Sequence, residues 1–245
     1  MDCKLCKSEY WSSSCARQVH WLVRSWLIAI CCLFNPWVWA EEKLPDVRIL
    51  IDVSGSMKQN DPNNLRVPAI ELLCRLMPNG SRAGMWFFAQ GVNPVVKISA
   101  VDADWKQNAI RLSKTIHSQG LLTNIGAALE QAAKESSPQG YQKHIILLTD
   151  GMVDVGPDAE KNQLQWRKIS GELLDKLKAD GFKIHTIALS ANADKNLLEK
   201  LSLKTDAASV MAVTADQLLP AFLQVFDTAS PQPQLPIEGN QFDVD

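Results

Sequence analysis

Oxygen-bearing side chains gather in three short segments of the sequence. These segments are Asp52-Val-Ser54-Gly55-Ser56, Gly120-Leu-Leu-Thr123-Asn124 and Thr149-Asp150-Gly151. Hard divalent cations such as Mg²⁺ prefer carboxylate, hydroxyl and water oxygens, and Mg²⁺ takes about six of them while it keeps several waters. The segments offer carboxylates and hydroxyls but no thiol or imidazole, so the chemistry they indicate is the binding of Mg²⁺ or a similar ion.

Five of these residues are the predicted metal ligands: Asp52, Ser54, Ser56, Thr123 and Asp150. The alternation Asp-x-Ser-x-Ser turns its three polar side chains toward a common point, and we expect Gly55 to let the loop bend tightly. Asn124 and Gly151, like Gly55, are expected to lie next to the metal ligands and to hold them in place without binding the ion themselves. With only two carboxylates the ion is not saturated, which leaves a coordination position and positive charge for an anionic ligand.

An ordinary structural role is the alternative for the same residues. Serine and threonine are also common helix N-caps and turn residues, and Asp-Gly often begins a loop. Asp61 and Asp154 lie in the neighbouring loops and are interpreted as solvated turn residues, although they could instead support the site.

Apolar runs alternate with helical patterns along the chain. The strands and helices that they predict must position the three polar segments. We predict strands at 47–51, 83–89, 95–98, 144–149, 183–189 and 209–213, and helices that end near 76 or span 103–116, 124–135, 158–180, 195–203 and 216–228. Uninterrupted apolar strands separated by amphipathic helices indicate an α/β fold, a doubly wound and mainly parallel sheet. The strand at 95–98 follows a tight turn and is the predicted antiparallel edge. Ligands bind such sheets at the carboxyl ends of the strands, where the three segments lie.

From about residue 46 to residue 228 the chain resembles a von Willebrand factor type A domain. The five predicted ligands match the five positions of that family's metal-ion-dependent adhesion site in residue type and chain order. The resemblance implies a Rossmann-like fold and a bound Mg²⁺, or else Mn²⁺ or Ca²⁺. It also implies that the hydroxyls touch the metal directly, that the aspartates often act through water, and that an Asp or Glu carboxylate of a protein partner completes the shell.

The sequence argues against the common enzyme classes that share this topology. No Gly-x-Ser-x-Gly surrounds Ser54 or Ser56, and neither a P-loop nor a Gly-x-Gly-x-x-Gly follows the first strand. Aspartyl-phosphate enzymes need a second carboxylate where this chain has Ser54. We therefore predict a non-catalytic binding module. The alternatives are a structural domain of a cell-envelope assembly whose metal serves stability only, and a Mg²⁺-dependent hydrolase.

The first 40 residues read as a bacterial export signal. Residues 1–25 carry a net charge of +2, an uncharged apolar run spans 26–34, and Val38-Trp39-Ala40 offers a small-x-small cleavage site. These are the three parts of a secretory signal peptide, and the run is short for a membrane span of about 20 residues. We predict cleavage after Ala40 and a periplasmic or secreted protein. A retained N-terminal anchor is the alternative, and it would be the chain's contact with the membrane; a lipoprotein is disfavoured.

After residue 40, the predicted domain spans 41–228, and residues 229–245 form a Pro/Gln-rich linker or the start of a further domain. The net charge of residues 41–245 is −4, which does not suit a nucleic-acid binder. Cys74 remains as a lone cysteine and is predicted to be buried. His117, His144 and His185 lack metal-ligand spacing and are interpreted as structural.

Overall fold

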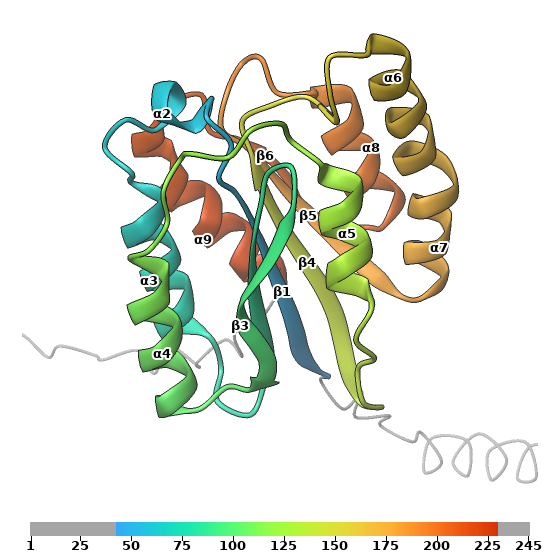
Figure 1. Ribbon diagram of the computed structural model, residues 1–245. Coiled ribbons are helices and arrows are strands. Elements are labelled where there is room, and N and C mark those ends of the chain that lie inside the picture. Colours follow the sequence, from blue (N-terminus) through green and yellow to red (C-terminus); the bar gives the residue numbers. More distant parts are fainter. Residues whose placement is uncertain (1–42, 230–245) are drawn as a thin grey trace, which may run out of the picture. The chain divides into compact units, whose positions relative to one another are not determined.

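A six-stranded sheet between two layers of helices forms the described part of this computed structural model, which covers residues 43–229 (Figure 1). The predicted signal peptide and the tail after Ala229 lie outside the described residues. The strands are β1 (Leu44–Asp52), β2 (Arg82–Phe88), β3 (Val92–Ala100), β4 (Tyr141–Thr149), β5 (Phe182–Ala188) and β6 (Ser209–Met211).

The strand order is β3-β2-β1-β4-β5-β6, and every neighbouring pair is parallel except β2 and β3. The predicted doubly wound, mainly parallel sheet with one antiparallel edge is therefore confirmed. β3 carries Pro94 and Lys97, residues that discourage the pairing of an edge strand with another chain.

Helices cover both faces of the sheet. One face carries α3 (Arg66–Leu76), α4 (Ala103–Ser113) and α9 (Leu218–Ala229) (Figure 1). The other carries α5 (Ile125–Ala133), α6 (Ala159–Lys168), the π-helical turn η1 (Ile169–Leu173), α7 (Leu174–Ala179) and α8 (Lys195–Lys204). The short helices α2 (Met57–Asn60) and η2 (Ala215–Gln217) complete the set.

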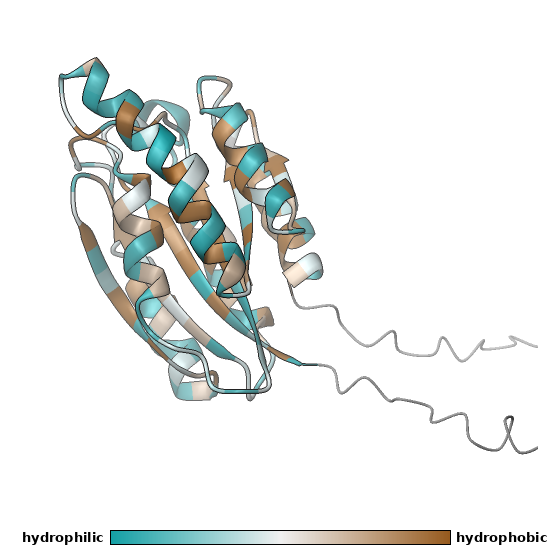
Figure 2. Ribbon diagram, turned by 90° about the vertical axis from the view of Figure 1, so that its right-hand side faces the viewer, coloured by the Kyte–Doolittle hydropathy of each residue, from teal (hydrophilic) through white to brown (hydrophobic). Residues whose placement is uncertain are grey.

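Each face of the sheet has its own apolar core, because successive side chains of a strand point to opposite faces. On β1, Val47, Ile49 and Ile51 are fully buried in one core, and Leu50 is fully buried in the other. Figure 2 shows the resulting pattern, with apolar residues along the strands and hydrophilic residues on much of the outer helix surface. No helix in residues 43–229 is long and apolar enough to span a bilayer.

The structure corrects several predicted helix details. The helix predicted at 103–116 ends at Ser113, α2 was not predicted, and the helix predicted at 158–180 contains the π turn η1. In that helix Trp166 is only half-buried, while Ile169 is fully buried. A single wide turn does not show in a search for regular helical spacing.

The buried Cys74 and two of the three histidines have the structural roles predicted for them. Cys74 is fully buried, and burial raises the pKa of its thiol to about 12. His144 Nδ1 and His185 Nε2 lie 3.0 Å apart inside the sheet layers. Desolvation lowers the pKa of His144 to about 3 and that of His185 to about 4, so both rings are neutral. His117 is exposed.

Candidate metal centre

The two predicted carboxylate ligands leave the sheet side by side. Asp52 is the last residue of β1, and Asp150 directly follows β4, which pairs in parallel with β1. From β1 the chain adds β2 and then β3 on one side, and β4, β5 and β6 follow in turn on the other side of β1. The strand order therefore reverses between β1 and β4. This is the position at which doubly wound sheets bind their ligands.

A continuous set of contacts joins the first and third segments. Ser54 N donates to Asp52 Oδ1 at 2.8 Å, the hydroxyls of Ser54 and Ser56 lie 3.0 Å apart, and Ser56 Oγ donates to Asp150 Oδ1 at 2.9 Å. Ser56 stands at the N-cap position of α2, yet its side chain makes no capping hydrogen bond. The hydroxyls of Ser54 and Ser56 therefore point at each other and at a carboxylate, not at a helix end.

Backbone pairing brings the second segment to the same place. Gly55 N donates to Gly120 O at 2.8 Å, and Thr123 exchanges two backbone hydrogen bonds with Asp154, at 2.8 and 3.0 Å. The Thr123 hydroxyl oxygen lies 3.4 Å from the position that a Cβ on Gly151 would occupy. All five predicted ligands thus belong to one cluster of three loops.

The supporting roles predicted for glycine and asparagine are only partly as expected. The loop turns at Gly55, where Met57 N donates to Ser54 O at 3.2 Å. Gly55 is not among the positive-φ glycines, however, and a Cβ there would stand an ordinary 3.5 Å from Gly120 O, so the turn does not require glycine. Gly120 is the glycine that the loops require, because a Cβ there would lie 2.2 Å from the Ala89 Cβ. Asn124 caps α5 by accepting from Ala127 N at 3.0 Å.

Two polar side chains that were not predicted as site residues hold the remaining carboxylate oxygens. Thr149 Oγ1 donates to Asp52 Oδ2 at 2.6 Å, and Asn60 Nδ2 donates to Asp150 Oδ2 at 2.9 Å. Thr149 ends the apolar run of β4 and directly precedes Asp150, so its hydroxyl could have been recognised as a site residue from the sequence. Nothing in the sequence around Asn60 distinguishes it from a surface asparagine.

Asp61 is buried, which contradicts its interpretation as a solvated turn residue. Its Oδ2 lies 3.0 Å from the Nε of Arg66, and both side chains are nearly inaccessible to solvent. Arg66 also donates to the backbone oxygen of Asp52 at 2.9 Å and to Ser118 Oγ at 2.7 Å, and so connects the first two loops beneath the site. Asp154, by contrast, is partly exposed and accepts from Gly156 N at 3.0 Å, as a turn residue does.

The charge of the cluster fits a cation. Asp52 and Asp150 are 0% and 2% exposed, and within residues 43–229 no lysine, arginine or histidine forms an ion pair with either carboxylate. Desolvation raises the pKa of Asp52 to about 6, hydrogen bonds from Thr149 and Ser54 lower it, and the negative charge of Asp150 raises it. A divalent ion among these oxygens would neutralise both carboxylates. In residues 43–229 no group of three or more His, Cys, Asp or Glu side chains is placed to hold a metal ion, so an ion at this site would depend on hydroxyl oxygens as well as the two carboxylates.

We expect Mg²⁺ binding to weaken as Asp52 takes up a proton. Because its pKa in the metal-free protein is about 6, Asp52 is ionised at pH 7.5 and mostly protonated at pH 5. The affinity is expected to fall by about tenfold between these pH values, since the ion must displace the proton. Titration calorimetry at both pH values measures this. Equal affinities would contradict the prediction, and an Asp52→Asn variant should bind weakly at both.

Comparison with known proteins yields one family and one fold. The sequence model of the von Willebrand factor type A domain matches residues 46–225. The fold is similar to "von Willebrand factor type A from Catenulispora acidiphila", with a TM-score of 0.61 and 19% identity over 75% of this chain and 42% of that one. It is also similar to proximal thread matrix protein 1 from the mussel byssus with a zinc-occupied MIDAS motif, with a TM-score of 0.59 and 20% identity over 76% and 48% of the two chains.

A third similar structure is BatB from Bacteroides thetaiotaomicron, with a TM-score of 0.55 and 16% identity over 75% of this chain and 97% of that one. This chain spans less than half the length of the Catenulispora and mussel structures. No curated protein sequence matches it.

Proposed function

Because the chain belongs to the von Willebrand factor type A family, we propose that it is an exported, non-catalytic binding module. In this proposal Asp52, Ser54, Ser56, Thr123 and Asp150 hold a divalent cation, and an Asp or Glu carboxylate of a protein partner completes the coordination. The observation that carries the proposal is the pair of buried carboxylates, neither of which forms an ion pair with a basic side chain of residues 43–229, linked by serine hydroxyls that no helix end uses.

The donor set supports a role in binding more than a role in catalysis. When bound, the metal supplies positive charge and an open coordination position. The protein's own side chains hold the ligands in place: Thr149 and Asn60 orient the two carboxylates, and Ser54 and Ser56 stay within 3.0 Å of each other. Residue 54 is serine, so it cannot act beside Asp52 as the general acid or base that catalysis would need.

A pull-down from cell-envelope extract tests the function. Immobilised domain (residues 41–245) in Mg²⁺ is expected to retain a protein that EDTA releases, and an Asp150→Asn variant should not retain it. A metal that serves stability only would change the melting temperature of the domain without any chelator-sensitive association. That outcome would contradict the proposed binding module and would favour a structural domain whose metal serves stability only.

We expect Mg²⁺ or Mn²⁺ to bind in preference to Zn²⁺. The cluster contains oxygen donors and no thiolate or imidazole, which are the ligands that favour zinc. Zinc occupies the MIDAS motif of the mussel protein, so it is the competing ion to include. Titration calorimetry with each ion measures the preference. Tight zinc binding without any response to Mg²⁺ would contradict it.

Export is proposed from the N-terminal sequence. Cleavage after Ala40 would start the mature chain at Glu41, shortly before β1 begins at Leu44. Mass spectrometry of the protein recovered from the periplasm or the medium should give this N-terminus. An N-terminus upstream of Trp26 would favour a retained membrane anchor instead.

A further inference from the structure

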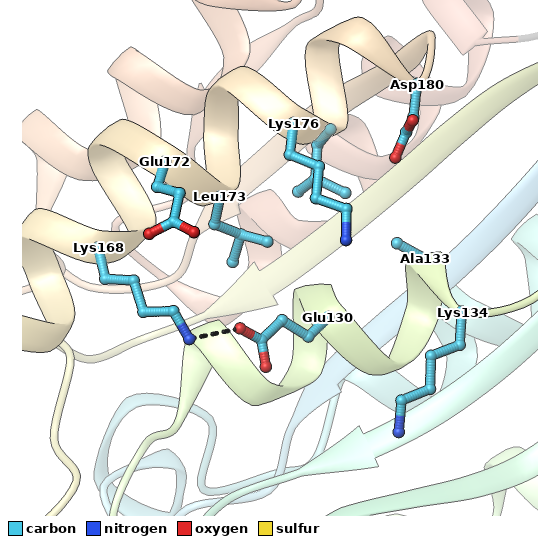
Figure 3. A pocket seen from close by; sticks show the side chains of 9 residues that line it. Glu130, Ala133, Lys134, Lys168, Glu172, Leu173, Lys176 and Asp180 are labelled. Atoms are coloured by element: carbon cyan, nitrogen blue, oxygen red, sulfur yellow. Dashed lines mark hydrogen bonds and ion pairs between the residues drawn. The ribbon is translucent and has the colours of Figure 1, made fainter.

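Titratable side chains outside the candidate metal centre differ in how their charge is compensated. In the pocket between α5 and α7, lysines stand beside acidic residues, and Lys168 Nζ lies 2.8 Å from Glu130 Oε1 (Figure 3). His144 and His185 differ from this cluster, because their side chains are buried and neither ring forms an ion pair with any residue of 43–229. The charge state of the two rings therefore depends on the hydrogen bonds around them.

The two histidines lie on the face of the sheet that α9 covers. His144 points to the same side of β4 as Ile146, and His185 points to the same side of β5 as Ile187, since side chains alternate along a strand. On this side β5 pairs with β6, the edge strand of three residues. Ala208, directly before β6, is bonded to β5 twice: its carbonyl oxygen accepts from Thr186 N at 3.0 Å, and its N–H donates to His185 Nδ1 at 3.2 Å.

These hydrogen bonds fix the positions of the protons on both rings. A neutral imidazole carries one proton, on one of its two nitrogens. Because Ala208 N donates to His185 Nδ1, the proton of His185 is on Nε2, which donates to His144 Nδ1 at 3.0 Å. His144 then carries its own proton on Nε2, a buried atom that has no hydrogen-bond partner among residues 43–229.

The pair cannot take up a proton without losing a hydrogen bond. Its two unprotonated nitrogens, His185 Nδ1 and His144 Nδ1, both already accept one. A proton on His185 Nδ1 displaces the Ala208 N–H. A proton on His144 Nδ1 faces the N–H of His185 Nε2, unless His185 moves its own proton to Nδ1 and so displaces Ala208 as well. The neutral pair therefore binds Ala208, and the charged pair does not.

The surroundings of the pair do not compensate a positive charge. Desolvation is the largest cause of the low pKa of both rings, and the charge of Lys183 lowers the pKa of both further. On β1 the residue opposite His144 is Val47. The one charged residue of β6 and α9 is Asp227, which is exposed, as is Asp206 in the loop before Ala208. No acidic side chain of residues 43–229 raises the pKa of either ring.

We propose that the His144–His185 pair is an acid-sensitive latch, which holds Ala208 and the β6 edge against β5 at neutral pH and releases them when it takes up a proton. In the released chain each ring is hydrated and has the ordinary histidine pKa of about 6.5. Because the pKa of both rings is lower in the folded protein, the stability that the latch provides is complete above about pH 6.5 and is lost as the pH falls. β6 opens first, since it is short and has one neighbouring strand.

Urea denaturation in EDTA at pH 7 and pH 5 tests the latch. Each ring that takes up a proton only on unfolding should raise the unfolding constant about 25-fold between these pH values, and the two together about 600-fold. The double variant His144→Asn, His185→Gln keeps an acceptor and a donor between the two positions and should lose this factor. His117→Gln is the matched control, because it removes an exposed histidine outside the pair and should leave the pH dependence unchanged.

Amide hydrogen exchange at the same two pH values locates the opening. After correction for the intrinsic exchange rate, protection at Ala208–Met211 should fall by about 25-fold or more from pH 7 to pH 5, because at least one ring is released with this segment. The amides of β4 should stay better protected than those of β6 at both pH values. In the double variant the protection of Ala208–Met211 should not depend on pH in this range.

Nitrogen NMR of the imidazoles in the wild type needs no variant. At pH 7 both rings are expected to carry their proton on Nε2, and a proton on His185 Nδ1 would overturn the latch. An equal loss of stability in the wild type and the double variant would also overturn it. So would β6 and β4 amides that exchange at the same rate at pH 5, or a ring that takes up a proton while Ala208–Met211 keep their protection.

Discussion

Replacing Asp150 by asparagine is expected to weaken Mg²⁺ binding by roughly a hundredfold. Asp150 is 2% exposed and supplies one of the two carboxylates of the site. A divalent ion and a carboxylate 4 Å apart at an effective dielectric constant of 20 interact by about 8 kcal/mol, and a net loss of about 3 kcal/mol remains because water solvates the ion when it is released. Ser54→Ala removes a neutral ligand and should weaken binding much less. Titration calorimetry on the three proteins measures both effects.

The stability of Asp150→Asn relative to the wild type should depend on whether Mg²⁺ is present. In EDTA, Asp150→Asn is expected to be neutral or stabilising, because Asp52 and Asp150 then no longer repel each other. At a Mg²⁺ concentration one hundred times the wild-type dissociation constant, the wild type gains about 2.7 kcal/mol and the variant only about 0.4 kcal/mol. Thermal melts of both proteins, each with EDTA and with Mg²⁺, give the four values. Equal Mg²⁺-induced shifts would exclude Asp150 from the site.

Replacing Arg66 by methionine is expected to destabilise the domain by about 3–5 kcal/mol, because a buried carboxylate is left without its partner. Arg66 is 1% exposed and ion-paired with Asp61. It also donates to the backbone oxygen of Asp52 and to Ser118, so its loss frees two of the three ligand loops. We therefore expect weaker Mg²⁺ binding in the fraction that stays folded. Urea denaturation and calorimetry below the melting temperature measure the two effects separately.

The double variant Asp61→Asn, Arg66→Met distinguishes the stability lost because the Asp61 carboxylate is unpaired from the stability lost because the Arg66 side chain no longer packs. It removes the uncompensated charge, so it should be more stable than Arg66→Met alone. Lys195→Met provides a control, because the pair of Lys195 with Glu199 is exposed and should matter little. If the double variant is no more stable than Arg66→Met, the cost does not come from the unpaired Asp61 carboxylate.

The sequence by itself determined the fold class and the residue types of the candidate site. The apolar strands and amphipathic helices depend on residues close together along the chain, so local spacing is enough to predict a mainly parallel sheet. In such a sheet the carboxyl ends of the strands share an edge, and for that reason the strand pattern alone predicts that Asp52 and Asp150 lie together. The five oxygen donors are read directly from residue type and order.

Only the tertiary structure decided which neighbours hold those donors. Asn60 and Asp150 are 90 residues apart, Arg66 and Ser118 are 52 apart, and no local pattern links the members of either pair. The same holds for Gly120, whose need for glycine comes from the approach of Ala89. Trp166 and Asp194, 28 residues apart, are likewise joined by a hydrogen bond that no local pattern indicates. Local spacing reports which side of an element is apolar, whereas the partner of a buried polar group is fixed by how separate elements pack, and that information is not contained in any short stretch of sequence.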